Sequence, residues 1–297
     1  MYHNPVMLDK CIEGLNISPN GVYVDVTFGG GGHSRAILDR LATGHLYAFD
    51  QDEDAAANAF NDPRFTFIPQ NFKYLKNFIW LHQGGPIDGI IADLGVSSHQ
   101  FDTPEKGFST RFDGPLDMRM SQMTPNDAAT VVNTYDHADL TRIFRLYGEM
   151  QQPHLIASDI IMARETGPIE TTAQLNAAVQ RRLPRGRENK VLAQIFQALR
   201  IEVNQELDVL ADFLKQCPDV LKSGGRLVVI SYHSLEDRIV KNFLKTGNAD
   251  GKEEKDFFGN PLTPYKLITR KALVPSDEEI EANSRARSAK LRIAERR

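Results

Sequence analysis

The pattern of hydrophobic and polar positions is clearest near the start of the chain. Val22, Val24 and Val26 alternate with polar or aromatic residues, which is the period of a β-strand. Four glycines, 29–32, interrupt this pattern, and apolar residues then recur at helical spacing as far as Leu38. The stretch from 22 to 38 therefore predicts a strand, a glycine loop and a helix.

Further strands are predicted along the chain. They are the segment LYAFD that ends at Asp50, the segments 65–68 and 87–92, and the segment SGGRLVVIS. Segment 87–92 is mostly apolar, as expected of a parallel strand that is covered on both faces. Near the C-terminus, KLITRKALV and segment 291–294 predict an antiparallel hairpin at the sheet edge. We therefore expect an α/β fold with a doubly wound, mostly parallel sheet and an antiparallel edge hairpin.

About a hundred residues between the fourth and fifth strands show helical spacing and no convincing strand. Thr124 is the expected N-cap of one helix, and the apolar positions from 195 to 214 predict one long helix that returns to the sheet. This organisation predicts an inserted all-helical domain. The expected limits are 1–104 and 201–297 for the two parts of the α/β domain, and 105–200 for the insertion.

Composition and charge narrow the class of protein. The chain has 297 residues, 41% of them hydrophobic, which suffices for a proper core. The net charge of -4 argues against indiscriminate nucleic-acid binding, although a local basic face stays open. No apolar run approaches the ~20 residues of a membrane span, and the start MYHNPVML lacks signal-peptide features, so we expect a cytoplasmic protein without membrane contact. Cys11 and Cys217 form no CxxC pattern, so we expect neither a metal cluster nor a disulfide framework.

The glycine loop indicates a ligand, because four consecutive glycines cost backbone entropy and the first strand-to-helix turn is where this fold binds nucleotides. The dinucleotide fingerprint GxGxxG is incomplete, since its third position falls on Ser34 or Arg35, and GxxxxGK[ST] has no match. S-adenosylmethionine, an adenosine ligand without pyrophosphate, fits these observations. Asp50 follows the loop at close to the ~20 residues typical of a ribose-binding carboxylate. The alternatives are a solvated helix start at Asp50 and a nicotinamide oxidoreductase.

Other polar and aromatic residues follow the predicted strands. Phe72 comes after the third strand, where it could lie on adenine or belong to the buried face of a helix. Asp93 ends the fourth strand, as a site residue or as a helix N-cap. His233 follows the fifth strand, and we interpret it as satisfied locally, with Ser234 and Asp237 resembling a helix cap.

Two segments are basic. The segment RRLPRGRENK, 181–190, is either a phosphate contact or an ordinary solvated turn. The segment RARSAKLRIAERR, from Arg285, is either a solvated face or part of an RNA surface. A non-enzymatic RNA-binding or assembly factor is therefore a second rival hypothesis.

The chain resembles the ribosomal RNA small-subunit methyltransferase H family, also called MraW. The matching segments are FGGGGHS, DLGVSS, GFSTRFDGPLDMRM, SYHSLEDRIVK and RARSAKLRIAE. The resemblance implies an S-adenosylmethionine-dependent enzyme that methylates the N4 amine of a cytidine in the decoding region, the P site, of 16S rRNA within the small ribosomal subunit. It also implies a Rossmann-like methyltransferase domain whose helical insertion recognises the substrate, and it leaves a homodimer open.

The resemblance also implies which residues contact the cofactor. These residues are Gly31, Gly32, His33, Asp50, Phe72, Asp93 and Gln100. His99 departs from the family pattern, which has proline there, and the loss of a fixed φ would loosen the loop that carries Gln100.

Direct methyl transfer is the expected mechanism. Methylation of a pyrimidine at carbon 5 requires a cysteine nucleophile, and neither Cys11 nor Cys217 follows a predicted strand. An exocyclic amine can attack the methyl group directly if the two are aligned. The fourth strand ends in DLGV and not in the D/N-P-P-Y/F of many amino-methyltransferases, so we expect Asp93 to accept a hydrogen bond from the amine or to orient the cofactor. Four aromatic residues are alternative candidates for stacking on the base, namely Phe101, Phe108, Phe112 or Tyr232.

Overall fold

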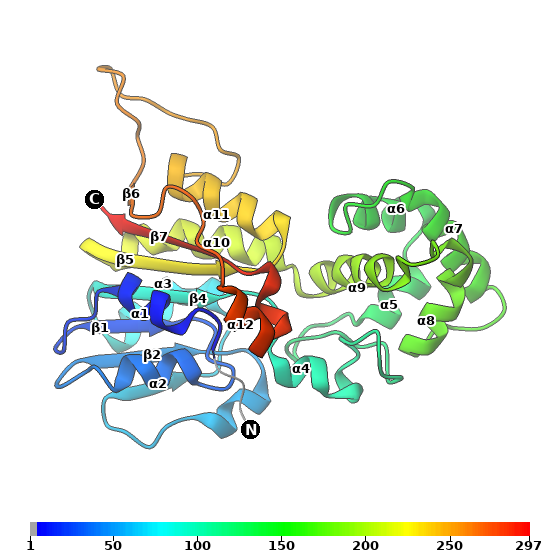
Figure 1. The fold of residues 1–297 in the computed structure, drawn as a ribbon, viewed down its shortest axis with the longest axis horizontal. Coiled ribbons are helices and arrows are strands. Elements are labelled where there is room, and N and C mark those ends of the chain that lie inside the picture. The colour runs from blue at the N-terminus through cyan, green and yellow to red at the C-terminus, as the bar shows by residue number, and fades with distance from the viewer. Residues whose placement is uncertain (1–4) are drawn as a thin grey trace. The chain divides into compact units, whose positions relative to one another are not determined.

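The computed structural model describes residues 5–297, which form two compact units (Figure 1). One unit comprises the chain up to Gly95 together with Leu207–Arg297, and the other comprises Val96–Glu206. These boundaries lie several residues from the expected limits at 104/105 and 200/201, because Phe101 packs against the core of the helical unit and its last helix runs to Asn204. The assignment of the helical unit to substrate recognition stays a prediction.

The first unit is built on a seven-stranded sheet in the order β3-β2-β1-β4-β5-β7-β6. Its strands are β1 Val22–Asp25, β2 His45–Phe49, β3 Phe65–Ile68, β4 Ile87–Asp93, β5 Leu221–Ser231, β6 Tyr265–Leu267 and β7 Lys290–Arg296. Strands β1 to β5 pair in parallel, and β7 runs antiparallel between β5 and β6. The predicted α/β fold and its antiparallel hairpin are confirmed, with β6 as the edge strand.

Helices cover both faces of this sheet. The helices are α1 Leu8–Leu15, α2 Gly32–Leu38, α3 Leu75–His82, α10 Glu206–Val220, α11 Ser234–Thr246 and α12 Asp277–Ala282. The neighbouring residues Tyr23 and Val24 of β1 belong to separate hydrophobic clusters, one of which includes α1 and α2 and the other α3, α10 and α11. Because side chains alternate between the faces of a strand, both clusters are needed to bury a parallel sheet.

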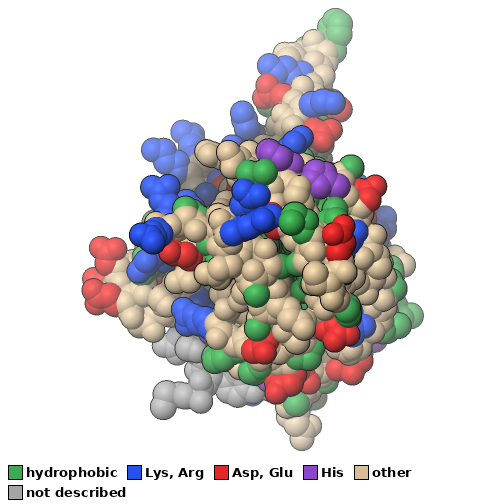
Figure 2. All heavy atoms as spheres, turned by 90° about the vertical axis from the view of Figure 1, so that its right-hand side faces the viewer, with side chains coloured by type: hydrophobic (Ala, Val, Ile, Leu, Met, Phe, Trp, Pro, Cys, Tyr) green, Lys and Arg blue, Asp and Glu red, His purple; other side chains and the backbone are tan. Residues whose placement is uncertain are grey.

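The second unit is helical and has a hydrophobic core of its own. Its helices are α4 Ser98–Asp102, α5 Ala128–Thr134, α6 His137–Leu146, α7 Pro153–Arg164, α8 Thr172–Val179 and α9 Glu188–Asn204. Figure 2 faces this unit and shows Lys and Arg side chains interspersed with acidic ones. Among the described residues, no helix combines the length and apolar character that a bilayer span requires.

Three local predictions were wrong. The long helix predicted from 195 to 214 is two helices, because Gln205 has a left-handed φ of 52° that ends α9 before α10 begins. The helix predicted to start at Thr124 begins at Ala128, because the Asp127 side chain accepts the Thr130 N–H at 2.7 Å. The cap of α11 is His233 with Glu236 and not Ser234 with Asp237. Asp237 instead accepts hydrogen bonds from Lys290 and Arg292 of β7, so two of the six basic residues in the C-terminal basic segment serve the fold.

The basic segment 181–190 is partly used within the helical unit. Arg181 and Arg182 both bond to the carboxylate of Asp159, whose side chain is only 1% exposed. The guanidinium groups, that of Arg181 foremost, hold the pKa of Asp159 below its usual range. Arg185, Arg187 and Lys190 are exposed and are therefore the better candidates for phosphate contacts.

We expect Asp159→Asn to lower the free energy of unfolding by about 1–3 kcal/mol, because two cations lose a buried acceptor. Thermal unfolding at neutral pH measures this loss. The pKa of Asp159 is lowered in the folded state, so its stabilising effect is present above the unfolded pKa and is lost as the pH falls through the folded pKa. Asp212→Asn, which removes an exposed i,i+3 pair with Lys215, is the matched control and should change little. Equal stability of the wild type and Asp159→Asn would contradict a structural role.

Candidate functional site

The carboxyl ends of β1 to β5 meet at one edge of the first unit. The chain order reverses between β1 and β4, and open α/β sheets bind ligands beyond the strand ends at such a point. Six of the seven predicted cofactor residues lie at the ends of these strands or in the segments that directly follow them. They are Gly31, Gly32, His33, Asp50, Phe72 and Asp93.

The glycine loop connects β1 to α2 with two residues in the left-handed region, Gly29 at φ 49° and Gly31 at φ 77°. A Cβ on Gly31 would lie 2.9 Å from the Phe60 ring, and one on Gly32 would lie 2.2 Å from Pro5. The glycines were predicted to make room for a ligand. This reason was wrong in part, because protein side chains already require glycine at two of the four positions.

Asp50 holds the glycine loop from the end of β2. Its carboxylate accepts the Gly29 N–H at 2.7 Å through Oδ2 and the Asp52 N–H at 2.9 Å through Oδ1. Burial raises the pKa of Asp50 to about 6. Each carboxylate oxygen has a second lone pair, so the group can still accept hydroxyl hydrogens from a sugar.

Asp93, at the end of β4, is the centre of a polar cluster. Its Oδ1 accepts the Tyr232 hydroxyl at 2.7 Å, its backbone N–H donates to the Thr27 hydroxyl at 2.7 Å, and its Oδ2 lies 3.8 Å from His33 Nδ1. The Asp93 side chain remains 24% exposed. Burial raises the pKa of Asp93, and burial together with the nearby Asp93 carboxylate raises the pKa of Tyr232. The α4 N-cap is Ser97, so the alternative reading of Asp93 as that cap was wrong.

His33 uses its ring for the protein itself. The ring is 6% exposed, and Nε2 lies 3.1 Å from the carbonyl oxygen of Val6, to which it must donate. With Nε2 bound to Val6, the other ring nitrogen, Nδ1, faces the Asp93 carboxylate. A cofactor contact by His33 would therefore use its backbone N–H, which has no partner inside α2 because it lies in the first turn.

A buried support for this cluster was missed by the sequence analysis. Asp25 is 2% exposed and accepts the Thr27 N–H at 3.0 Å and the Ser34 hydroxyl at 2.7 Å. Burial raises the pKa of Asp25. These bonds tie the end of β1 to the first turn of α2. The available signal was a polar residue, Asp25, at the end of a buried strand, with Thr27 two positions later.

Phe72 lies in a 3-10 turn, Phe72–Tyr74, that precedes α3. Its ring contacts the edge of Phe213 in α10, with ring centroids 5.3 Å apart, and the side chain is partly exposed. The buried face of α3 is formed by Leu75 and Ile79. Phe72 precedes α3 but packs against the same hydrophobic cluster as Leu75 and Ile79, so a buried packing role and a ring face for adenine both stay open.

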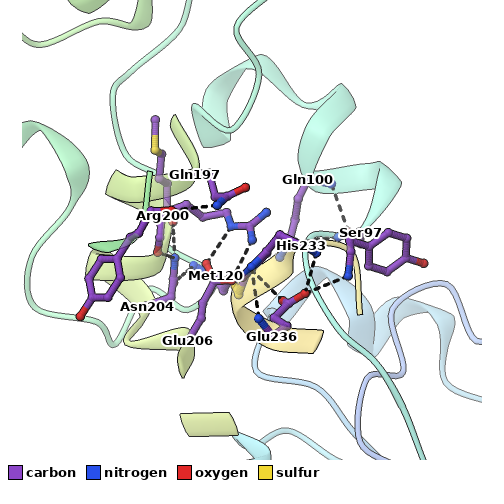
Figure 3. Close-up of polar contacts among 12 residues, drawn as sticks. Ser97, Gln100, Met120, Gln197, Arg200, Asn204, Glu206, His233 and Glu236 are labelled. Carbon is purple, nitrogen blue, oxygen red and sulfur yellow. Dashed lines mark hydrogen bonds and ion pairs between the residues drawn. The ribbon is translucent and has the colours of Figure 1, made fainter. Parts of the chain in front are cut away.

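Gln100 lies in the helical unit, in α4. Its side chain accepts the Ser97 N–H at 3.0 Å, and its own N–H donates to the Ser97 hydroxyl at 3.2 Å, which forms a complete capping box (Figure 3). These bonds give α4 a defined start although His99 replaces the expected proline. The role of Gln100 at the cofactor stays a prediction. In the sheet unit, Figure 3 also shows His233 beside Glu236, whose carboxylate accepts the Tyr232 N–H at 2.9 Å.

The candidates for stacking on a base differ in accessibility. Phe108 is 4% exposed within the core of the helical unit, so its assignment was wrong, because stacking would require it to leave that core. Phe112 is 46% exposed. Phe101 and Tyr232 are partly buried, and the Tyr232 hydroxyl is bound to Asp93.

Neither cysteine is suited to attack a substrate. Cys11 in α1 and Cys217 in α10 are both fully buried. Burial raises the pKa of both thiols, whereas a cysteine nucleophile needs a lowered pKa and access to its substrate.

The groups at the strand ends suit a nucleoside without a pyrophosphate. The glycine loop has no side chains at positions 29–32, so a ligand can approach its backbone closely, and Asp50 offers acceptors for a sugar diol. Phe72 offers a partly exposed aromatic ring. S-adenosylmethionine has an adenine ring and a ribose diol and lacks a pyrophosphate, so the residues present fit it.

Comparisons with known proteins identify relatives along the whole chain. The sequence matches the MraW methylase family over residues 1–297. A Flavobacterium johnsoniae protein named ribosomal RNA small subunit methyltransferase H is 58% identical over 296 residues, which cover 99% of this chain and 98% of the relative. A protein of the same name from Bacteroides fragilis is 56% identical over 297 residues, which cover 100% of this chain and 98% of the relative.

Among solved structures, an rRNA methylase from Streptococcus thermophilus has a TM-score of 0.42 and 13% identity, and 97% of this chain and 93% of that chain are covered. The full-length family match confirms both the resemblance and the expected cofactor. The chain belongs to the MraW methylase family, a family of S-adenosylmethionine-dependent methyltransferases.

Proposed function

We propose that this protein methylates the N4 amine of a cytidine in the decoding region of 16S rRNA, within the small ribosomal subunit. Relatives at 58% and 56% identity are named ribosomal RNA small subunit methyltransferase H, which supports rRNA of the small subunit as the substrate class. The structural observation that carries the proposal is Asp93, a carboxylate held by Tyr232 at the end of β4 and still 24% exposed.

The cofactor would be held by the strand ends of the sheet unit. Asp50 would accept the ribose hydroxyls, the backbone of Gly31 and Gly32 would lie against the ligand, and Phe72 would contact adenine. When bound, S-adenosylmethionine supplies a methyl group on a sulfonium sulfur, which keeps the electron pair of the broken bond. We propose that Gln100 completes this set from the helical unit.

Asp93 would position the amine of the substrate. A carboxylate accepts a hydrogen bond from the N4 amine, and this bond orients the nitrogen toward the methyl group. The new carbon–nitrogen bond would make the nitrogen positive, and Asp93 would take the proton that the nitrogen then releases. Burial already raises the pKa of Asp93, which makes this carboxylate a better proton acceptor than an exposed one.

Tyr232 would fix the orientation of that carboxylate through the bond to Oδ1. The target base must be unstacked or already single-stranded, since its amine must reach the end of the sheet. Both thiols are buried and have raised pKa values, which supports direct transfer without a covalent enzyme intermediate.

Mapping of the methyl group tests this proposal. Small subunits from a strain that lacks this chain are incubated with the protein and tritiated S-adenosylmethionine, and the label is located on the digested rRNA. We expect one labelled cytidine, methylated at N4, in the decoding region. Label at carbon 5, on another base or on protein would contradict the proposed reaction.

A further inference from the structure

Residues 252–262 form an exposed hairpin in the sheet unit, between α11 and β6. Lys255 and Pro261 form an isolated antiparallel bridge, and the Leu262 N–H donates to the Glu254 carbonyl at 2.8 Å. Figure 1 shows this segment, in orange, extending away from α11 and β6. None of the residues proposed to bind the cofactor or the substrate amine lies in this segment.

The tip of this hairpin has a defined conformation. The Asp256 Oδ1 accepts the backbone N–H groups of Phe258 and Asn260, each at 2.8 Å, and the Gly259 N–H donates to the Asp256 carbonyl at 3.0 Å. Gly259 has a φ of 84°, which favours glycine. These bonds close a tight turn, so the two residues between Asp256 and Gly259 are presented on an ordered support.

Those two residues are phenylalanines that make almost no contact with the rest of the molecule. Phe257 is 98% exposed and Phe258 is 85% exposed, and their rings lie edge to face with centroids 5.6 Å apart. The projection at the top of Figure 2 ends in hydrophobic side chains, with charged side chains along its length. Aromatic side chains held in water on an ordered turn are typical of interaction anchors.

The charges beside the tip indicate the kind of partner. Segment 250–256 contains four acidic residues and two lysines. Lys252 Nζ lies 3.9 Å from Asp250 Oδ2, and Lys255 Nζ lies 3.6 Å from Glu253 Oε2. Both lysines are therefore next to acids of the same segment. The anchor is therefore surrounded by net negative charge.

This charge disfavours two of the three occupants that could cover the phenyl rings. Sites for single-stranded nucleic acid combine aromatic rings with a positive groove, whereas acids repel phosphates. A second copy of this chain docked through the same hairpin would place two acidic segments together. A basic protein surface with an apolar pocket complements both the rings and the charge.

We propose that the 252–262 hairpin is a docking element that inserts Phe257 and Phe258 into an apolar pocket with a cationic rim on a protein of the substrate particle. This inference rests on the proposed function, which makes the small subunit the substrate, and it adds that the enzyme recognises a protein component of that subunit. Protein-free rRNA would then lack one of the contacts of the assembled particle.

The test compares two probes, purified small ribosomal subunits and the rRNA extracted from the same subunits. Replacement of both phenylalanines by serine is expected to raise the Kd for subunits about 30-fold or more. Binding of protein-free rRNA and of S-adenosylmethionine should stay unchanged. The matched control is Leu81→Ser, which removes a 74% exposed apolar side chain from α3 and should leave all three affinities unchanged.

Two further variants separate presentation from charge. Asp256→Ala keeps both phenyl rings but removes the two side-chain bonds to the N–H groups of Phe258 and Asn260 together with one acid, and it should weaken subunit binding as well. Glu254→Lys should weaken binding to a cationic rim, whereas it would strengthen binding to RNA.

Several results would overturn the inference. An equal loss with protein-free rRNA, or tighter binding by Glu254→Lys, would identify RNA as the occupant. A dimer in sedimentation that the double serine variant abolishes would identify a second copy. Unchanged subunit binding by that variant, or no subunit binding by the wild type, would leave the hairpin without a docking role. Methyl incorporation is measured in the same samples, so wild-type protein that methylates subunits would keep the proposed function intact in each of these cases.

Discussion

Replacement of Asp93 by asparagine is expected to lower kcat by about 10²- to 10⁴-fold, with little change in the Kd for S-adenosylmethionine. Asparagine has the size of aspartate and keeps one oxygen that can accept the Tyr232 hydroxyl. It has no negative charge and cannot take a proton from the methylated amine. Single-turnover methylation of small subunits gives the rate, and calorimetry with the cofactor gives the affinity.

Tyr232→Phe is expected to have a smaller effect on kcat than Asp93→Asn. The Tyr232 hydroxyl stabilises the charged form of Asp93, so its loss should raise the pKa of Asp93 further. The carboxylate would then be protonated at a higher pH, and the acidic limb of the pH–rate profile should move upward. A smaller loss of kcat, about tenfold, is expected at neutral pH. Undiminished methylation by Asp93→Asn would remove Asp93 from both of its proposed roles, which are to position the amine and to accept its proton.

Replacement of Asp50 by asparagine is expected to raise the Kd for S-adenosylmethionine by about 10- to 150-fold, since hydrogen bonds to a charged group contribute about 1.5–3 kcal/mol. One carboxylate oxygen becomes an amide nitrogen, which cannot accept a ribose hydroxyl or a backbone N–H. Asp52→Asn is the matched control, because Asp52 caps the neighbouring 3-10 helix through the Asp54 N–H at 3.1 Å. An affinity in Asp50→Asn equal to that of the wild type would exclude Asp50 as the ribose acceptor.

The wild-type affinity should also depend on pH through Asp50. Burial raises the pKa of Asp50 to about 6, so the carboxylate is charged above that pH and protonated below it. Cofactor affinity should therefore be constant at pH 7 to 8 and fall as the pH drops below about 6. Asp50→Asn should show no such fall. The stability of the cofactor-free protein should change in the opposite direction. An acid whose pKa is raised by burial makes the folded state bind protons more readily than the unfolded state, so the contribution of Asp50 to the free energy of unfolding falls as the pH rises.

Much of the fold and part of the site could be predicted because they depend on short-range patterns. Alternation and apolar runs located the five parallel strands and placed Asp50 and Asp93 at two of their ends, and the family resemblance added their expected cofactor contacts. Local hydrogen bonding limited the accuracy at helix ends. Asp127 is the N-cap of α5, and His233 is the N-cap of α11. The left-handed backbone of Gln205 ends α9, although the apolar positions continue at helical spacing into α10.

Contacts between distant segments could not be predicted from such patterns. Arg181 and Arg182 have the composition of a phosphate-binding turn, yet both bond to the buried Asp159. Phe108 has the context of a loop near a site, yet it packs within the helical core. A periodic pattern shows which residues share a face of one element, whereas these outcomes depend on which other element lies against that face.

The amino-acid sequence by itself determined the α/β class, the helical insertion, the glycine loop and the family to which the chain belongs. Only the tertiary structure decided that Tyr232 bonds to Asp93, 139 positions earlier in the chain, and that Phe60 and Pro5 require glycine at 31 and 32. The physical reason is that the order of strands in the sheet brings β4, β5 and the glycine loop together. Side chains far apart in the sequence become neighbours there, and no local period carries that information.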